Sequence, residues 1–218
     1  MAFEAIYRGP NPCPAAMKNI EDILITSLER VVNEFGKDEL AFLALTTKIE
    51  LPLRDRWAYV LYRKLKKHGL VASREWKRVD LALLRGVVPQ VLIELKAMYT
   101  FDAVHEGGNY KKRINYLFED IKKASKLVDK DKDIYGVLLV THPTQTIPLN
   151  KFTNIIKYIP GINGALKRFG NQKRVMNVAV DRIEKLLTLG KHAIVRKGIM
   201  FGGSAFGIKT NVLYWVIK

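Results

Sequence analysis

Residues 78–99 read RVDLALLRGVVPQVLIELKAMY, two apolar runs separated by a short polar segment. Runs of this length that are rich in Val, Leu and Ile predict β-strands, and the RGVVPQ connection predicts an antiparallel hairpin. Three charged residues interrupt these strands: Asp80 in the first, and Glu94 and Lys96 in the second. Because burying an unpaired charge is costly, these side chains need either partners or a chemical role.

Alternation along a strand places Leu92, Glu94 and Lys96 on one face. If the hairpin turns near residues 87–88, positions whose numbers sum to about 175 face each other, and Asp80 lies beside Glu94 or Lys96. One interpretation is a cross-strand salt-bridge cluster at a sheet rim, worth about 0–1 kcal/mol per pair.

The other interpretation is a metal site. Adjacent buried carboxylates are stabilised by a cation, and Mg²⁺ takes oxygen ligands when it also binds phosphate. A neighbouring lysine can orient or deprotonate a water, or stabilise the phosphate. The apolar flanks of both strands favour this second interpretation and, with it, phosphodiester hydrolysis.

The composition points to a folded protein with a polyanionic partner. The chain has 218 residues, of which 48% are hydrophobic, so one domain with a packed core is expected and disorder is excluded. The formal net charge is +16, and residues 151–218 alone hold 13 Lys and Arg against 2 Asp and Glu. Nucleic acid is the commonest partner of such a surface, and an anionic membrane surface is the alternative.

Several classes of protein are disfavoured. Cys13 is the only cysteine, so no intrachain disulfide can form, which suits a reducing cytoplasm. We expect a cytoplasmic protein that is neither secreted nor membrane-spanning, since no basic-then-apolar signal and no run of about 20 apolar residues occurs. The four histidines lack zinc-site spacing, and no phosphate-binding glycine motif occurs, so no small-molecule cofactor is expected.

The rest of the chain alternates helical and strand-like patterns. Apolar spacing predicts helices over residues 16–35, 38–48 (capped by Asp38), 53–68, 109–128, 149–159 and 162–189, with a break at Pro160-Gly161, and strands over 70–76, 78–84, 91–99, 134–143 and the C-terminal stretch. This order predicts an α+β protein, an α/β sandwich around a central mixed sheet. We divide the single domain 1–218 into N-terminal helices at 15–50, a core at 53–143 and a basic C-terminal helix-plus-strand extension at 144–218.

Asp80, separated by 13 intervening residues from Glu94-Leu95-Lys96, resembles the signature of the PD-(D/E)XK nuclease superfamily. That superfamily has a restriction-endonuclease-like core of order α-β-β-β-α-β, which is the order predicted for residues 53–143. Its aspartate lies on the second core strand and its E-x-K on the third. The resemblance covers about 90 residues, and EWKRVDLALL…VLIELKAMY is also similar to Holliday-junction resolvases. Val79 stands where many members have proline.

The resemblance implies roles for particular residues. Asp80 and Glu94 become metal ligands, the Leu95 backbone carbonyl a third, and Lys96 the catalytic lysine. Mg²⁺ is the implied cofactor, with Mn²⁺ able to substitute. The superfamily often adds an acidic residue from the helix before the first strand, and Asp55 is the candidate; its alternative role is a helix-N-terminal acid that interacts with the dipole.

Basic residues of the later helices are candidates for phosphate contact. They are Lys111, Lys112, Arg113, Lys167, Arg168, Lys173 and Arg174. A solvated helix surface is the alternative for each of them.

The function expected from these features is a metal-dependent DNA endonuclease of type II restriction kind that acts on double-stranded DNA. Cutting both strands with one site per chain would call for a homodimer. A Holliday-junction resolvase or a DNA repair nuclease would use the same residues. The alternatives from other classes are a non-catalytic nucleic-acid-binding protein and a basic scaffold for protein or anionic lipid.

Overall fold

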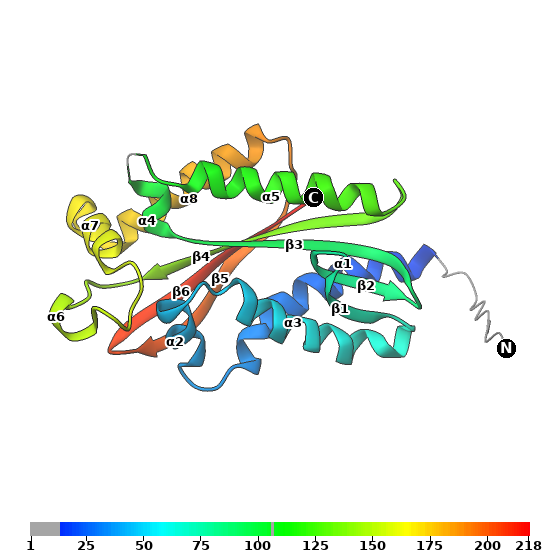
Figure 1. Cartoon of the computed structure of the whole chain (residues 1–218), viewed down its shortest axis with the longest axis horizontal. Coiled ribbons are helices and arrows are strands. Elements are labelled where there is room, and N and C mark those ends of the chain that lie inside the picture. Colours follow the sequence, from blue (N-terminus) through cyan, green and yellow to red (C-terminus); the bar gives the residue numbers. More distant parts are fainter. Residues whose placement is uncertain (1–13, 106) are drawn as a thin grey trace.

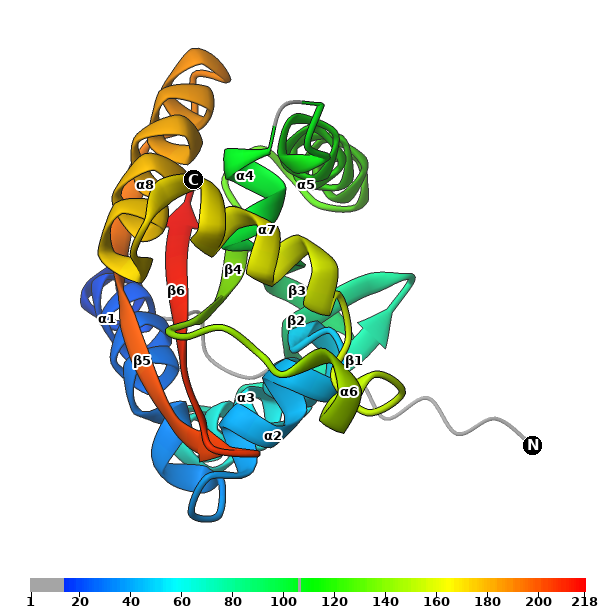
Figure 2. The ribbon, with the colours of Figure 1, turned by 90° about the vertical axis from the view of Figure 1, so that its left-hand side faces the viewer.

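The computed structural model describes residues 14–105 and 107–218, so Cys13 and the predicted N-terminal arm lie outside the described residues. A six-stranded sheet lies between two layers of helices (Figures 1 and 2). Its strands are β1 Val71–Trp76, β2 Val79–Arg85, β3 Val88–Tyr99, β4 Asp133–Pro143, β5 Ile194–Ala205 and β6 Ile208–Ile217, in the order β1-β2-β3-β4-β6-β5. The predicted α+β class with a mixed sheet is therefore confirmed.

The helices of the described residues are α1 Pro14–Arg30, α2 Glu39–Thr46, α3 Glu50–Leu65, α4 Thr100–Val104, α5 Tyr110–Ala124, α6 Leu149–Phe152, α7 Ile159–Phe169 and α8 Gln172–Leu189. Short 3₁₀ turns extend three of them: η1 Val31–Glu34, η2 Lys66–His68 and η3 Ser125–Leu127. The predicted helix over 109–128 thus corresponds to α5 and η3. The short α4, which joins β3 to α5, was not predicted.

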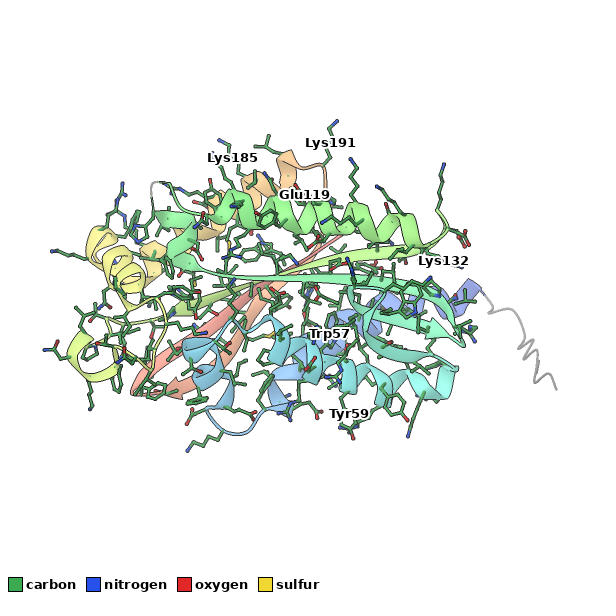
Figure 3. The ribbon with its side chains drawn as sticks, in the orientation of Figure 1. Trp57, Tyr59, Glu119, Lys132, Lys185 and Lys191 are labelled. Carbon is green, nitrogen blue, oxygen red and sulfur yellow. The ribbon has the colours of Figure 1, made fainter. Side chains whose placement is uncertain are left out.

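One face of the sheet is covered by α1, α2 and α3. Leu24 and Leu28 of α1 and Trp57 of α3 belong to one apolar cluster with Leu95 of β3. Trp57 points toward the sheet and donates from its indole N–H to the hydroxyl of Ser27 at 2.8 Å (Figure 3). The exposed Tyr59 points outward, as the helical period requires two residues later (Figure 3).

The opposite face is covered by α4, α5, α7 and α8 (Figure 2). The stripe Val175, Ala179, Ile183 and Leu187 on α8 has a four-residue period and packs into the same cluster as Ile114 and Leu117 of α5. Trp215 of β6 is buried beneath these helices. This second layer holds α5 along β3, where the charged residues of β3 lie (Figure 1).

Strand β3 changes the direction of pairing at the centre of the sheet. It is antiparallel to β2, as the hairpin prediction required, and parallel to β4 through the α4–α5 crossover. Strand β6 pairs antiparallel with β4 on one side and with β5 on the other. The segment that we described as a C-terminal extension therefore supplies two strands to the same continuous sheet.

Three local predictions were wrong. The helix predicted over 149–159 is limited to α6, and turns follow it up to Tyr158. The helix predicted over 162–189 begins earlier, with Pro160 in the first turn of α7, where a missing N–H costs no hydrogen bond, and it is interrupted at Gly170, whose φ is 78°. Asp38 precedes α2 but its side chain makes no cap. Its φ is 62°, and its carboxylate instead accepts a hydrogen bond from the backbone N–H of Ser204 at 2.8 Å.

Candidate functional site

The β2–β3 hairpin brings the predicted acidic pair together. Leu81 pairs with Ile93, so the register places Asp80 opposite Glu94. The Asp80 carboxylate accepts a hydrogen bond from the backbone N–H of Leu95 at 2.8 Å. This bond fixes one carboxylate oxygen against β3, next to the backbone segment that carries Glu94 and Lys96.

Glu94 and Lys96 point toward α5. Leu92, on the same face of β3, packs against Ala124 of α5, and the intervening residues belong to the cluster on the opposite face. Glu94 is 5% exposed. Across the sheet it faces Gly136 of β4, where a Cβ would meet the Ile121 side chain of α5 at 2.6 Å. The glycine therefore allows α5 to approach the sheet closely beside the carboxylates.

The position of Glu94 beside Asp80 disfavours its ionised form. Burial, together with the negative charge of Asp80 and a hydrogen bond between the two side chains, raises the pKa of Glu94 to about 8. At neutral pH Glu94 is therefore largely protonated when no cation is present, and its hydroxyl donates to Asp80. Two carboxyl groups that share one proton are a site at which a cation can replace that proton.

Lys96 is held by an acid that the sequence analysis missed. Its ammonium donates to the carbonyl oxygen of Leu95 at 3.0 Å and forms an ion pair with Asp120 of α5 at 2.8 Å. Burial opposes the charge of Lys96, but Asp120, Glu50 and Asp80 outweigh it and raise the lysine pKa. Burial also opposes the charge on Asp120, yet bonds from Lys123 and Lys96 lower its pKa.

The acid from the first core helix is Glu50. Its carboxylate accepts a hydrogen bond from the backbone N–H of Ala97 at 2.9 Å, so neighbouring donors on β3 are bound by Asp80 and Glu50. Burial raises the pKa of Glu50, and the charge of Asp80 adds to this, while Lys96 opposes it. Glu50 therefore lies within electrostatic reach of the carboxylate pair.

Asp55 does not lie in the cleft. Its carboxylate forms ion pairs with Arg54 at 2.9 Å and Arg74 at 2.9 Å. Arg54 is 5% exposed and also binds Glu75 at 2.9 Å, and it comes within 3.8 Å of Asp80. This placement does not support the prediction that Asp55 adds a metal ligand. Asp55 follows Glu50 by five residues on α3, so its side chain points about 140° away from that of Glu50 around the helix axis.

Asp80, Glu94, Lys96 and Asp120 line an open cleft of about 500 Å³, which lies between the β1–β2 turn, β3 and α5. The basic residues on its walls are Lys77, Arg78 and Lys123, none of which we predicted as a phosphate contact. The signal was present as the dipeptide Lys77-Arg78 immediately before Val79-Asp80.

The predicted basic residues lie elsewhere. Lys111, Lys112 and Arg113 occupy the first turn of α5, about 10–14 Å along the helix from Asp120. Lys167 and Arg168 end α7 and Lys173 and Arg174 begin α8, beyond the carboxyl end of β3 (Figure 1). The structure therefore gathers neither group around the carboxylates.

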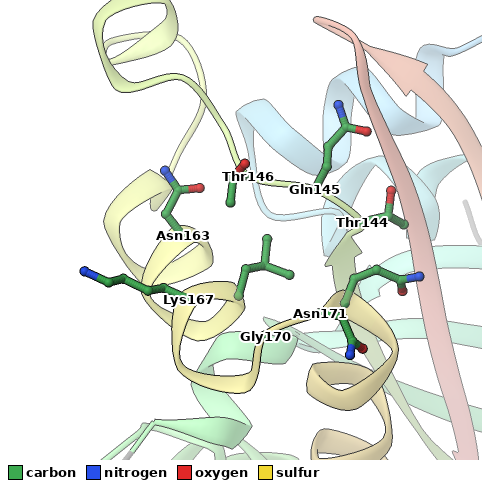
Figure 4. A pocket seen from close by; sticks show the side chains of 9 residues that line it. Thr144, Gln145, Thr146, Asn163, Lys167, Gly170 and Asn171 are labelled. Carbon is green, nitrogen blue, oxygen red and sulfur yellow. The ribbon is translucent and has the colours of Figure 1, made fainter.

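A second hollow, of about 630 Å³, lies beside α7 and the start of α8 (Figure 4). Its amides are used within the fold. Asn163 exchanges two hydrogen bonds with the backbone of Ile147, Asn171 accepts from the Arg174 N–H, and Gln172 bonds the buried His142. This hollow is larger than the cleft, but its polar groups serve to join the β4–α6 connection to α7 and α8.

The donor set of the cleft fits a hard divalent cation. Within residues 14–105 and 107–218, no group of three or more His, Cys, Asp or Glu side chains is placed to hold a metal ion. Two carboxylates and the Leu95 carbonyl oxygen nevertheless suit Mg²⁺, which usually keeps waters and takes substrate phosphate as further ligands. The burial of Glu94 beside Asp80 favours a cation there, because it raises the pKa of Glu94.

The comparisons with known proteins identify no relative. No protein family matches the chain, and neither a curated protein nor a solved structure matches it. In the part of the chain that the structure describes, no helix has the length and apolar character needed to cross a membrane.

Proposed function

We propose that this protein is a metal-dependent DNA endonuclease that hydrolyses phosphodiester bonds, with a restriction-endonuclease-like core formed by residues 50–143. The observation that carries the proposal is the convergence of Asp80, Glu94 and Lys96 in one cleft. The order α3, β1, β2, β3, α5, β4 also agrees with that core. The net charge of +16 supports a polyanionic substrate.

In this proposal the acidic residues form the cation site. Asp80, Glu94 and the Leu95 carbonyl oxygen would hold Mg²⁺, for which Mn²⁺ would substitute; when bound it supplies a Lewis acid that polarises phosphate and lowers the pKa of water. Glu94 would hold a cation in its ionised form, so it would give up its proton there. Asp80 stays in place because the Leu95 N–H holds one of its oxygens.

Lys96 acts as a cation. Because its pKa is raised, it is fully protonated at neutral pH and cannot accept the proton of the attacking water. Its ammonium instead stabilises the charge that develops on the phosphate and orients the water. The water oxygen forms a bond to phosphorus and loses a proton to solvent, the ester P–O bond breaks, and the leaving oxygen takes a proton from solvent, so the products are a phosphate monoester and a hydroxyl.

The test is incubation of supercoiled plasmid, linear duplex and a four-way junction with the protein in Mg²⁺, Mn²⁺ or EDTA. We expect nicking or linearisation with either metal and none in EDTA. Lys122→Ala, which removes an exposed cation from the same helix as Asp120, should leave the rate unchanged. Preferential cutting of the junction would identify a resolvase, and binding of all three substrates without cutting in any metal would leave a non-catalytic nucleic-acid-binding protein.

The oligomeric state follows from the same proposal. A restriction-type enzyme that cuts both strands would act as a homodimer, whose two-fold axis matches a palindromic site. Sedimentation of the protein with and without duplex DNA would test this. A monomer on DNA that produces only nicks would favour a repair nuclease.

A further inference from the structure

The two-residue turn between β1 and β2 is built from residues that suit it poorly. Trp76 pairs with Val79, so Lys77 and Arg78 alone connect the strands. Their φ angles are 49° and 73°. Two-residue hairpins with positive φ at both positions strongly favour Asn-Gly, because side chains with a Cβ strain the left-handed region. Glu75, two residues earlier, also has a positive φ of 55°.

This strained turn lies at the proposed catalytic cleft. Lys77 and Arg78 line the cleft that contains Asp80 and Glu94, and Asp80 follows Arg78 by two residues on β2. A phosphate held by the turn would therefore lie next to one placed over the carboxylates. Strained residues persist where the surrounding structure requires their side chains, and they gather at functional sites.

The two cations of the turn are also available for a ligand. Both are exposed, and among the described residues neither has an ion pair; Lys77 lies 4.8 Å over the ring of Trp76. Neighbouring basic residues already have acidic partners: Arg54 and Arg74 pair with Asp55, and Lys123 pairs with Asp120. The turn therefore offers positive charge that no nearby carboxylate neutralises.

We infer that Lys77 and Arg78 form a phosphate clamp that binds the DNA backbone beside the bond to be cut, and that the chain retains a strained turn in order to place these two cations there. This inference rests on the proposed nuclease function, because it takes the cleft as the place where the DNA strand lies. It assigns backbone contact to this turn in addition to the basic residues of α7 and α8. Backbone contacts of this kind position the substrate and carry no base specificity.

The test exchanges the turn for the sequence that its geometry favours. The double variant Lys77→Asn/Arg78→Gly should fold, and its Tm should rise by several degrees because the strain is relieved. Its Kd for a labelled duplex, measured in EDTA at low salt, should increase about 10-fold. The slope of log K against log salt should become shallower by about 2, since two phosphate contacts are lost.

The control removes the same charge from a remote place. Lys66→Ala/Lys67→Ala changes two exposed cations of η2, and we expect a slope close to that of the wild type. An equal change of slope in both double variants, or no change in the turn variant, would overturn the clamp. A turn variant that binds weakly without a gain in Tm would overturn the link to strain.

The outcome is independent of catalysis. Binding is measured in EDTA, where no cutting is expected. If the protein cuts DNA but its DNA affinity is unchanged in the turn variant, the clamp is refuted and the nuclease proposal stays intact. A protein that never cuts but whose affinity depends on the turn would refute the nuclease proposal and would keep only the contact between the turn and the DNA backbone.

Discussion

Replacing Glu94 with glutamine separates the effect of its proton from every other acid of the cleft. The pKa of Glu94 is about 8, against an ordinary value of 4.5 in the unfolded chain. Since the folded protein binds this proton more tightly, the stabilisation is fully present below pH 4.5 and is lost as the pH rises to about 8. Each pH unit within this window removes about 1.4 kcal/mol.

Between pH 5 and pH 8 the metal-free wild type should therefore lose up to about 3 kcal/mol of unfolding free energy through Glu94. Glu94→Gln keeps the size of the side chain and cannot ionise, so this part of the slope should vanish. The assay is urea unfolding in EDTA at several pH values. Glu119→Gln, on the exposed side of α5, is the matched control and should follow the wild type (Figure 3).

Mg²⁺ should stabilise the folded protein with a pH dependence opposite to that of the Glu94 proton. A cation that binds the ionised pair competes with the proton, so the stabilisation by Mg²⁺ should be greater at pH 8 than at pH 6. At pH 7 its binding should release about 0.9 proton, which calorimetry in two buffers of different ionisation enthalpy measures. Parallel pH curves for the wild type and Glu94→Gln in EDTA, or no proton release, would refute the assignment of the proton to this pair.

Three further substitutions test the groups around the pair. Asp120→Asn removes the partner of Lys96 and should slow single-turnover cleavage about 10-fold or more with little change in DNA affinity, because it perturbs the placement of the ammonium. Glu50→Gln keeps an acceptor for the Ala97 N–H, so far-ultraviolet circular dichroism should not change, while the Kd for Mg²⁺ measured by calorimetry should increase. Arg54→Leu removes the arginine that binds Glu75 and one of the two arginines that bind Asp55, and it should lower the free energy of unfolding by about 1–2 kcal/mol in urea.

The β2–β3 hairpin, with the strand that carries Glu94 and Lys96, could be predicted from the sequence because its information is local. Alternation placed Glu94 and Lys96 on one face, and the length of the connection set the register of Asp80 within one residue. The position of β6 between β4 and β5 depends on pairing between distant segments, which no local pattern encodes.

The two additional acids show the limits of local patterns. The helix that we began at residue 53 begins at Glu50, because Pro52 fits its first turn, where the N–H groups have no intrahelical partner. That shift changed which acid of α3 reaches β3 from Asp55 to Glu50, whose carboxylate accepts from the backbone N–H of Ala97. Asp120 shares a helical face with Leu117 and Ala124, so its position three and four residues from buried neighbours was a signal that it points toward the sheet.

The most direct test of the central claim is cleavage and binding of one labelled duplex by the wild type and by Lys96→Ala. The account predicts that the wild type cuts the duplex in Mg²⁺ but not in EDTA, and that Lys96→Ala binds it with similar affinity and does not cut. Cleavage by Lys96→Ala at the wild-type rate, or a wild type that cuts equally well in EDTA, would contradict the assignment of Asp80, Glu94 and Lys96 as a metal-dependent nuclease site.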